Sequence, residues 1–223
     1  SFVPYFVSEQ EYYEWVDWEK DYISSALSKI EAVIDIQFVE KDYFSEPDPY
    51  YENLALVPYW EDSTSLGWHQ VPEEILSGET FTDYTLAGFY NWHPNVWNDL
   101  TLAPGGLSYS TVIHEVLHGL GLAHPHDNGG GSLIFPGVTD AFGSYGDYNL
   151  NQEIYTIMSY NAGFPEQFGP TSDTVGNAST PMALDIAALQ YIYGANMLHN
   201  IGDDTYNLPT LIEAGTSWES IWD

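Results

Sequence analysis

HEVLHGLGLAH, residues 114–124, is the most informative segment of the chain. His114 and His118 stand four positions apart, so on a helix both imidazoles project from the same face. Gly121 lets the helix end sharply because glycine tolerates a positive φ, and the chain can then turn back and present His124 as a third ligand. Three protein ligands leave the fourth tetrahedral position of a zinc ion open, as catalytic zinc sites do. The segment therefore predicts a helix that leads into a zinc site.

Glu115 lies on the same predicted helix, residues 108–119, and has no evident structural task there. It can reach a water molecule activated by the metal while its side chain is turned away from ligation, which is the general-base geometry of helical His-Glu-x-x-His sites. The pattern thus predicts a hydrolase in which Glu115 takes a proton from water. Two alternatives stay open, namely a zinc-binding interaction module without proteolysis and a zinc hydrolase of a non-peptide amide.

Three segments together resemble the metzincin zinc endopeptidases and, among them, the serralysin branch of secreted bacterial proteases. The first is the histidine segment with Pro125 directly after it, and the second is TIMSY, residues 156–160, which is similar to the Met-turn of that branch. The third is PMALDIAALQ, residues 181–190, with YGAN at residues 193–196, which resembles the serralysin C-terminal helix. The resemblance covers most of the chain and is loose before Ser108.

The resemblance implies roles for two further residues. Met158 forms an apolar floor beneath the three imidazoles and is not a ligand. Tyr160 is a further zinc contact in the resting enzyme and swings away to hydrogen-bond the oxyanion, which is chemically sound because a phenol oxygen can ligate and its O–H can donate. The implied protein is a secreted zinc metalloendopeptidase (EC 3.4.24 type) that acts on proteins or peptides. Zn²⁺ is its cofactor, Ca²⁺ is a family-level expectation, and a proteinaceous inhibitor is a further partner to expect.

The implied fold class is α+β, a metzincin (zincin-like) fold with two lobes. The N-terminal lobe, about residues 1–124, carries a twisted mixed β-sheet and long helices. The C-terminal lobe, about residues 125–200, is irregular apart from the Met-turn and one long helix. That helix is predicted with Thr180 as N-cap, Pro181 at its first position and Gly194 as its stop.

Residues 201–223 resemble the connector that leads, in serralysins, into a C-terminal calcium-binding β-roll. This chain contains no such repeat, so we expect a catalytic-domain fragment. Within the domain, Asp127 with Asn128, and Asp140 with Asp147, are oxygen-rich and could ligate calcium. Neither pair has the spacing of a dedicated calcium loop, and solvated turns are the favoured interpretation.

Hydrophobic periodicity predicts the remaining elements. Apolar residues recur at helical spacing from Tyr12 to Ile34, and Ser8 with Glu11 forms a capping-box pair, which predicts one long amphipathic helix. Alternating or apolar runs predict strands at residues 34–38, 54–60, 81–90 and 98–102. In metzincins an edge strand binds the substrate backbone, and we expect residues 86–90 to be its counterpart, with an ordinary core strand as the alternative.

The other histidines carry less weight. His126 lies two residues beyond His124, but a proline between them constrains the path, so we expect a cleft-wall or surface role. His69, His93 and His199 stand in turn-like or terminal contexts and are expected to be structural.

Charge and composition exclude several classes of function. The chain has 33 acidic residues and 3 lysines, for a formal charge of −30, and no fixed positive charge follows Lys41. Nucleic acid and anionic membranes bind through clustered cations, so neither is expected as a partner, and no run approaches the ~18 apolar residues of a membrane span. Without cysteine, thiol catalysis and cysteine-ligated zinc are excluded. We expect a monomer. Because its cleft has no cationic residue, one hypothesis is that it tolerates or attracts cationic substrates, with rates that fall as salt rises; the alternative is that the surplus of acid reflects a saline or calcium-rich habitat.

Overall fold

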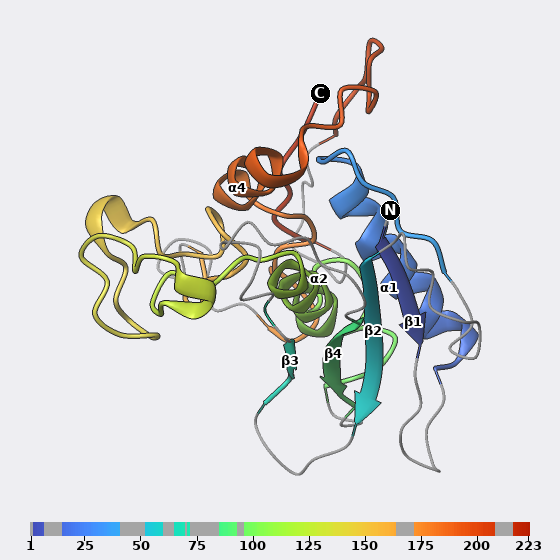
Figure 1. Cartoon of the computed structure of the whole chain (residues 1–223), viewed down its shortest axis with the longest axis horizontal. Coiled ribbons are helices and arrows are strands. Elements are labelled where there is room, and N and C mark those ends of the chain that lie inside the picture. Colours follow the sequence, from blue (N-terminus) through green and yellow to red (C-terminus); the bar gives the residue numbers. More distant parts are fainter. Residues whose placement is uncertain are drawn as a thin grey trace.

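The computed structural model describes residues 2–6, 15–40, 52–59, 65–69, 71, 85–92, 96–163, 172–207 and 216–223. These residues contain four strands, three α-helices and two short 3₁₀ turns (Figure 1). In chain order they are β1 (Phe2–Phe6), α1 (Asp17–Glu31), β2 (Glu52–Tyr59), β3 (Gly67–His69), β4 (Thr85–Asn91), α2 (Leu107–Gly119), η1 (Gly129–Gly131), η2 (Asp147–Asn149) and α4 (Ala183–Tyr193). The predicted α+β class is confirmed. No helix among the described residues is long and apolar enough to cross a membrane.

The strands form one mixed sheet in the order β1-β2-β4-β3. β1 and β4 both run parallel to β2, whereas β3 pairs antiparallel with β4. Trp68 of β3 stacks on Phe89 of β4 with ring centroids 4.2 Å apart, which fixes the register of this short strand. β4 therefore lies inside the described sheet and β3 at its edge. The prediction that residues 86–90 form the substrate-binding edge strand is wrong, and the core-strand alternative is correct.

The first helix is shorter than its periodicity predicts. α1 begins at Asp17, and the backbone N–H of Val16 donates to Glu19 Oε2 over 3.0 Å, which caps the first turn. Its buried face carries Ile23 and Ile30, in agreement with the predicted apolar stripe. The predicted capping pair, Ser8 and Glu11, lies outside the described residues.

Two predicted strands are absent from their described positions. Ile34 makes only an isolated bridge to Ala195, so residues 34–38 add no strand to the sheet. Near residue 98 the side chain of Asn98 decides the local structure, because its Oδ1 accepts the N–H groups of Leu100 (3.0 Å) and Thr101 (3.2 Å). A side chain that takes up neighbouring backbone donors favours a turn over a strand. The strands predicted at residues 54–60 and 81–90 are confirmed as β2 and β4 where those residues are described.

The C-terminal part is irregular up to α4, as predicted, and extends away from the sheet in Figure 1. The N-cap of α4 is Met182 and not Thr180. The reason is Asp185, whose Oδ2 accepts the Met182 backbone N–H over 2.8 Å and so satisfies a donor of the first turn from within the helix. Gly194 ends the helix with a φ of +82°, as predicted.

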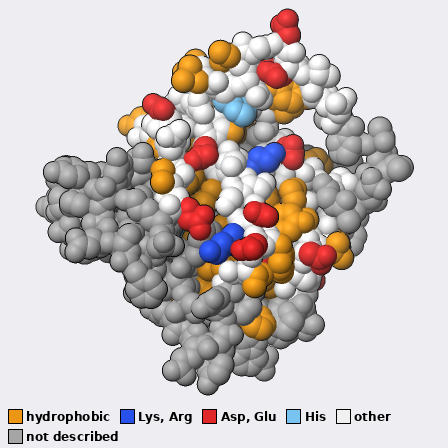
Figure 2. Space-filling view, turned by 90° about the vertical axis from the view of Figure 1, so that its right-hand side faces the viewer, with side chains coloured by type: hydrophobic (Ala, Val, Ile, Leu, Met, Phe, Trp, Pro, Cys, Tyr) orange, Lys and Arg blue, Asp and Glu red, His pale blue; other side chains and the backbone are white. Residues whose placement is uncertain are grey.

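Both lysines that the structure describes are paired with carboxylates. Lys20 Nζ lies 3.7 Å from Glu40 Oε1, and Lys29 Nζ lies 3.8 Å from Glu219 Oε1. Figure 2 shows these blue side chains on one face, each beside red acidic groups. The pairs are exposed, so they contribute little to stability. Both described lysines thus already have a carboxylate partner within the protein.

Candidate metal centre and adjoining cavity

α2 holds the two motif histidines in the interior. Residues 108–119 are all buried, and the helix packs against β3, β4 and α1. Its N-cap, Gly106, lies so close to the Thr101 carbonyl that a Cβ there would overlap the oxygen. Beyond the helix Gly121 adopts a φ of +97°, which confirms the predicted turn and brings His124 back beside His114.

The three imidazoles of the motif converge through their Nε2 atoms. His124 Nε2 lies 3.1 Å from His114 Nε2 and 3.0 Å from His118 Nε2. Each opposite nitrogen, Nδ1, faces an oxygen: His114 Nδ1 lies 2.8 Å from the Ile157 carbonyl and His118 Nδ1 lies 2.7 Å from the Leu122 carbonyl. Because a carbonyl oxygen can only accept, these Nδ1 atoms carry the protons.

This arrangement fits a metal ion. With the proton on Nδ1, each Nε2 presents a lone pair, and neutral lone pairs facing one another at 3.0–3.1 Å do not form hydrogen bonds. Tetrahedral zinc with Zn–N bonds of about 2.05 Å separates its ligand nitrogens by about 3.3 Å, close to the observed spacing. Burial and the neighbouring histidines lower the pKa of His114 well below its usual value and that of His118 to about 4. Both rings are therefore neutral near pH 7 and able to ligate.

Asp127 holds the third histidine in place. Its Oδ2 lies 2.6 Å from His124 Nδ1, and its Oδ1 accepts the Gly129 N–H over 3.0 Å. A carboxylate behind a ligating imidazole fixes its tautomer and orientation. The sequence suggested Asp127 only as a calcium ligand or a solvated turn residue, so its contact with His124 was not predicted. Its position three residues after His124 was the available signal.

His126 stacks on His124, with ring centroids 4.8 Å apart and planes 17° apart, and lies 4.8 Å from the Tyr160 ring. It thus lies at the wall of the site, where we expected it. His69 is buried and lies where a Cβ on Gly88 or Gly119 would clash with its ring. His93 lies outside the described residues.

Glu115 is a buried carboxylate beside the histidines. Burial raises its pKa to about 8, and its Oε2 has no hydrogen-bond partner and is enclosed. A cation held by the imidazoles would favour its ionised form. Gly67 of β3 lies against it, since a Cβ on that glycine would come within 3.1 Å of Glu115 Cγ. The edge strand and the general-base candidate are therefore neighbours.

Asp185 anchors the segment beneath the histidines. It accepts the Thr156 hydroxyl at 2.5 Å and the Ile157 N–H at 2.8 Å, while the Ile157 carbonyl faces His114 Nδ1. Met158 follows and is 1% exposed, in agreement with an apolar floor. Sequence reasoning missed Asp185, although an acidic residue in the first turn of a predicted helix was a signal for capping.

Tyr160 stands at the open side of the site with 43% of its surface exposed. Its ring centroid lies 4.7 Å from that of His124 and 5.8 Å from that of His114, and the ring stacks on Phe142 at 5.4 Å. Burial, followed by the charges of Glu115 and Asp127, raises the pKa of Tyr160 to about 12. The hydroxyl therefore keeps its proton near neutral pH.

A cavity of about 370 Å³ adjoins these groups. Such a volume is in the range of ligand-binding pockets. On one side residues 65–67 lead into β3, and on another α2 contributes residues from Leu107 to Glu115. The lining is completed by Glu153, Ile157, residues 159–162, Phe142 and Asn177.

Metal-binding side chains converge at two places among the described residues. One is His114, His118 and His124, and the other is His124 with His126 and Asp127. Neither group contains Asp140 or Asp147, so the structure gives no support to calcium at that pair.

Comparisons with known proteins agree with the motifs. The chain is 27% identical to a serralysin from Proteus mirabilis over 95% of this chain and 43% of the relative. It is 34% identical to serralysin C from Dickeya chrysanthemi over 56% of this chain and 24% of the relative, and 38% identical to metallopeptidase AprA from Pseudomonas marginalis over 43% and 19%. The chain thus spans less than half the length of these relatives. The predicted resemblance to serralysins is confirmed.

No family model matches the chain. Among solved structures it is similar to high choriolytic enzyme 1, a hatching enzyme zinc-protease from medaka fish, with a TM-score of 0.42 and 14% identity over 86% of this chain and 88% of that one. Myroilysin gives a TM-score of 0.41 and 16% identity over 86% and 82%. Scores of this size carry no conclusion about the site.

Proposed function

We propose that the chain is the catalytic domain of a secreted zinc endopeptidase. The observation that carries this proposal is the convergence of three Nε2 atoms, with that of His124 lying 3.0–3.1 Å from the other two, while every Nδ1 faces an oxygen. Glu115, with its free Oε2, lines the same cavity as His114. The similarity to serralysins supports peptide hydrolysis, export and protein or peptide substrates for this domain.

The residues of the chain then divide the work of hydrolysis. Zinc on His114, His118 and His124 would supply a Lewis acid that polarises the scissile carbonyl and acidifies a water molecule. Glu115 takes the proton of the attacking water and delivers a proton to the leaving amine. Tyr160, protonated because its pKa is raised to about 12, donates its O–H to the oxyanion.

The edge strand β3 offers a place for the substrate backbone. It pairs with β4 on one side, and residues 65–67 line the cavity next to Glu115. An extended peptide can add to such an edge through main-chain hydrogen bonds. We therefore assign to β3 the substrate-binding part that the sequence had suggested for residues 86–90.

Replacing Glu115 by alanine tests the assignment. The Glu115→Ala protein should retain one equivalent of zinc, measured by atomic absorption, and lose casein hydrolysis by more than about 100-fold, which is the contribution of a general base. Glu40→Ala, which removes an exposed carboxylate, is the matched control and should keep full activity. Casein hydrolysis that persists in the Glu115 variant would refute the mechanism.

Removal of the metal provides a second test. The chelator 1,10-phenanthroline should abolish casein hydrolysis, and added zinc should restore it. If zinc binds stoichiometrically but neither casein nor a peptide panel is cleaved, the zinc-binding interaction module replaces the endopeptidase. If small non-peptide amides are hydrolysed and peptides are not, the protein is a zinc hydrolase of non-peptide amides and not an endopeptidase.

A further inference from the structure

The cavity contains a second buried carboxylate, Glu153, which the proposed reaction does not use. Glu153 is 8% exposed. Its side chain accepts two hydrogen bonds, both at Oε1, from Ser110 Oγ at 3.2 Å and from the Ala178 N–H at 2.6 Å. Oε2 accepts no hydrogen bond from any described residue, and it is not one of the fully enclosed atoms without a partner. Since Glu153 lines the cavity, Oε2 is the carboxylate oxygen that is available to accept a hydrogen bond from a ligand in it.

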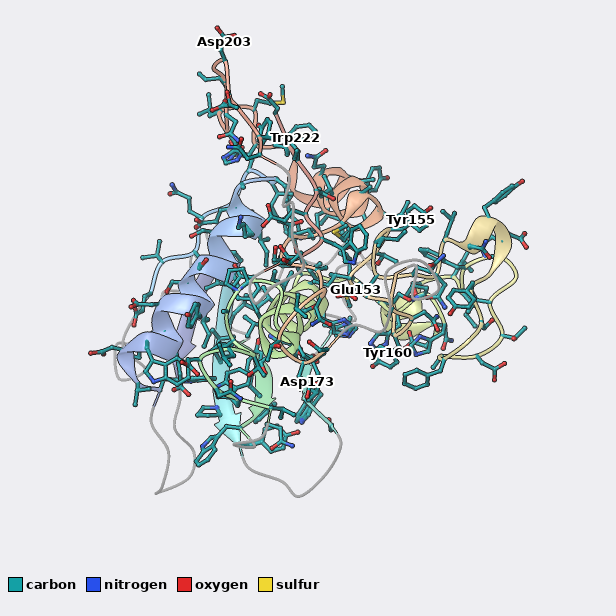
Figure 3. The ribbon with its side chains drawn as sticks, turned by 180° about the vertical axis from the view of Figure 1, so that it is seen from behind. Glu153, Tyr155, Tyr160, Asp173, Asp203 and Trp222 are labelled. Carbon is teal, nitrogen blue, oxygen red and sulfur yellow. The ribbon has the colours of Figure 1, made fainter. Side chains whose placement is uncertain are left out.

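The position of Glu153 relative to the metal centre follows from α2. Ser110, which holds Oε1, precedes His114 by one helical turn, a distance of about 6 Å along the axis. Glu153 and Tyr160, both labelled in Figure 3, line the same cavity. The lining of one cavity of about 370 Å³ thus includes both a candidate zinc ligand, His114, and Glu153.

The protein supplies no cation for this carboxylate among the residues described. Lys20 and Lys29 pair with Glu40 and Glu219, and after Lys41 the sequence has neither lysine nor arginine. Burying an ionised carboxylate costs free energy when one of its oxygens has no hydrogen-bond donor or cation beside it. The missing partner can therefore come with the substrate.

We propose that Glu153 makes the cavity a specificity pocket for a lysine or arginine side chain. The inference rests on the proposed endopeptidase function and adds its substrate class. Glu115 lines the same cavity and gives its proton to the leaving amine, which places the basic side chain on the amine side of the bond that is cut. Oε2 accepts the cationic head, and the apolar stem packs on Leu107 and Ile157 of the lining.

The composition of the chain agrees with this specificity. A protease that requires a basic residue finds three such residues in its own sequence. Lys20 and Lys29 lie within α1, where a regular helix keeps the backbone from adding to the edge of a sheet. Residues 42–223 contain no site at all. A protease with this specificity would thus find few cleavage sites in its own catalytic domain.

The first experiment uses the wild-type zinc enzyme and changes only the peptide. Quenched peptides with lysine, norleucine, glutamine or glutamate after the scissile bond should give a kcat/KM that is about 10- to 100-fold higher for lysine than for norleucine. Equal values, or a preference for glutamine or glutamate, would overturn the inference while leaving the endopeptidase in place. Cleavage of none of the peptides would instead contradict the proposed function.

The second experiment changes the pocket. Glu153→Gln keeps an oxygen for Ser110 and Ala178 and removes the charge, so it should reduce the ratio of the kcat/KM for lysine to that for norleucine towards 1. Glu40→Gln is the matched control and should keep the wild-type ratio. An unchanged ratio in a folded Glu153→Gln protein contradicts the role of Glu153. If that variant does not fold, the peptide series on the wild type still decides.

A binding measurement separates recognition from turnover. Zinc-loaded Glu115→Ala protein should bind the lysine peptide about 10-fold or more tighter than the norleucine peptide in isothermal titration. Adding Glu153→Gln to this variant should remove the difference. Equal affinities in the first titration would overturn the inference even if no peptide is ever cleaved.

Discussion

Substitutions of Asp185 test whether its hydrogen bonds hold the segment at Thr156 and Ile157 in place beneath the histidines. The alanine and asparagine variants should differ in stability. Oδ1 accepts the Thr156 hydroxyl, and Oδ2 accepts the backbone N–H groups of Ile157 and Met182. Asp185→Ala leaves these three buried donors without a partner, at about 1–3 kcal/mol each, so a loss of about 3 kcal/mol or more in unfolding free energy is expected.

Asp185→Asn should be far milder at neutral pH. Its amide oxygen can take the place of Oδ2 and accept both N–H groups, and its NH₂ can donate to the Thr156 hydroxyl, which is also able to accept. Asparagine in this orientation resembles the protonated aspartic acid. We expect a change below about 1 kcal/mol at pH 8, measured by urea unfolding in EDTA so that metal loss does not enter.

The pH dependence tests the protonation of Asp185 separately. Burial raises its pKa from 3.8 to about 6 in the folded protein. The folded state thus binds this proton more tightly than the unfolded chain, so its stabilising effect grows as pH falls through about 6 and is complete below 3.8. Between pH 8 and pH 5 the wild type should gain stability relative to Asp185→Asn, on the order of 1 kcal/mol.

Two results would refute this reasoning. If Asp185→Asn is as unstable as Asp185→Ala at pH 8, the hydrogen bonds do not hold the segment as described. If the gap between wild type and Asp185→Asn does not grow from pH 8 to pH 5, the carboxyl does not titrate in that range.

Two further predictions follow from other contacts. Asp127→Ala removes the oxygen behind His124 and should weaken zinc affinity by about 10- to 100-fold in competition with a chelating dye, and an unchanged affinity would contradict its positioning role. Gly106→Ala should lower the unfolding free energy by about 2 kcal/mol or more, because its Cβ would overlap the backbone of Thr101. Gly202→Ala is the control, since its nearest neighbour would lie 3.9 Å from the new Cβ, and thermal melting should leave it within about 0.5 kcal/mol of wild type.

The parts of the fold that the sequence predicts well are those decided by local pattern. α2 has a regular apolar stripe and a glycine at its exit, and both its extent and the positive φ of Gly121 agree with expectation. β2 is an apolar run long enough to be recognised without knowledge of its neighbours. Gly194 likewise ends α4 where predicted, because the requirement for positive φ is a property of the residue itself.

The failures come from interactions with partners distant in sequence or from side chains that compete with the backbone. The alternation at residues 34–38 is that of a strand, but these residues belong to no strand of the described sheet, and Ile34 makes an isolated bridge to Ala195 instead. Asn98 turns its segment by bonding backbone donors, which hydrophobic periodicity does not register. The order of β4 and β3 in the sheet depends on strand pairing, so the edge could not be identified from residues 86–90 alone.

The same distinction explains the site. The three histidines and Glu115 lie within one segment, so spacing alone brings them together. Glu153 interacts with Ser110 across 43 positions of the chain, and its carboxylate looks like one acid among 33 until the fold places it in the cavity. Sequence therefore predicts the group of residues proposed for the chemistry, whereas the residue proposed for specificity emerges only from packing.

α2 gives a physical reason why the proposed catalytic residues and the proposed specificity residue, Glu153, keep a constant spacing. One buried helix carries His114, His118 and Glu115, and one turn earlier it carries Ser110, which holds the Glu153 carboxylate. Because a packed helix moves as a rigid body, the distance from the metal site to the carboxylate changes little when surface loops rearrange. In the proposed pocket, a substrate lysine would bind Glu153 with its ammonium group. Because the spacing between Glu153 and the histidines is fixed, this binding would determine which peptide bond lies at the metal site.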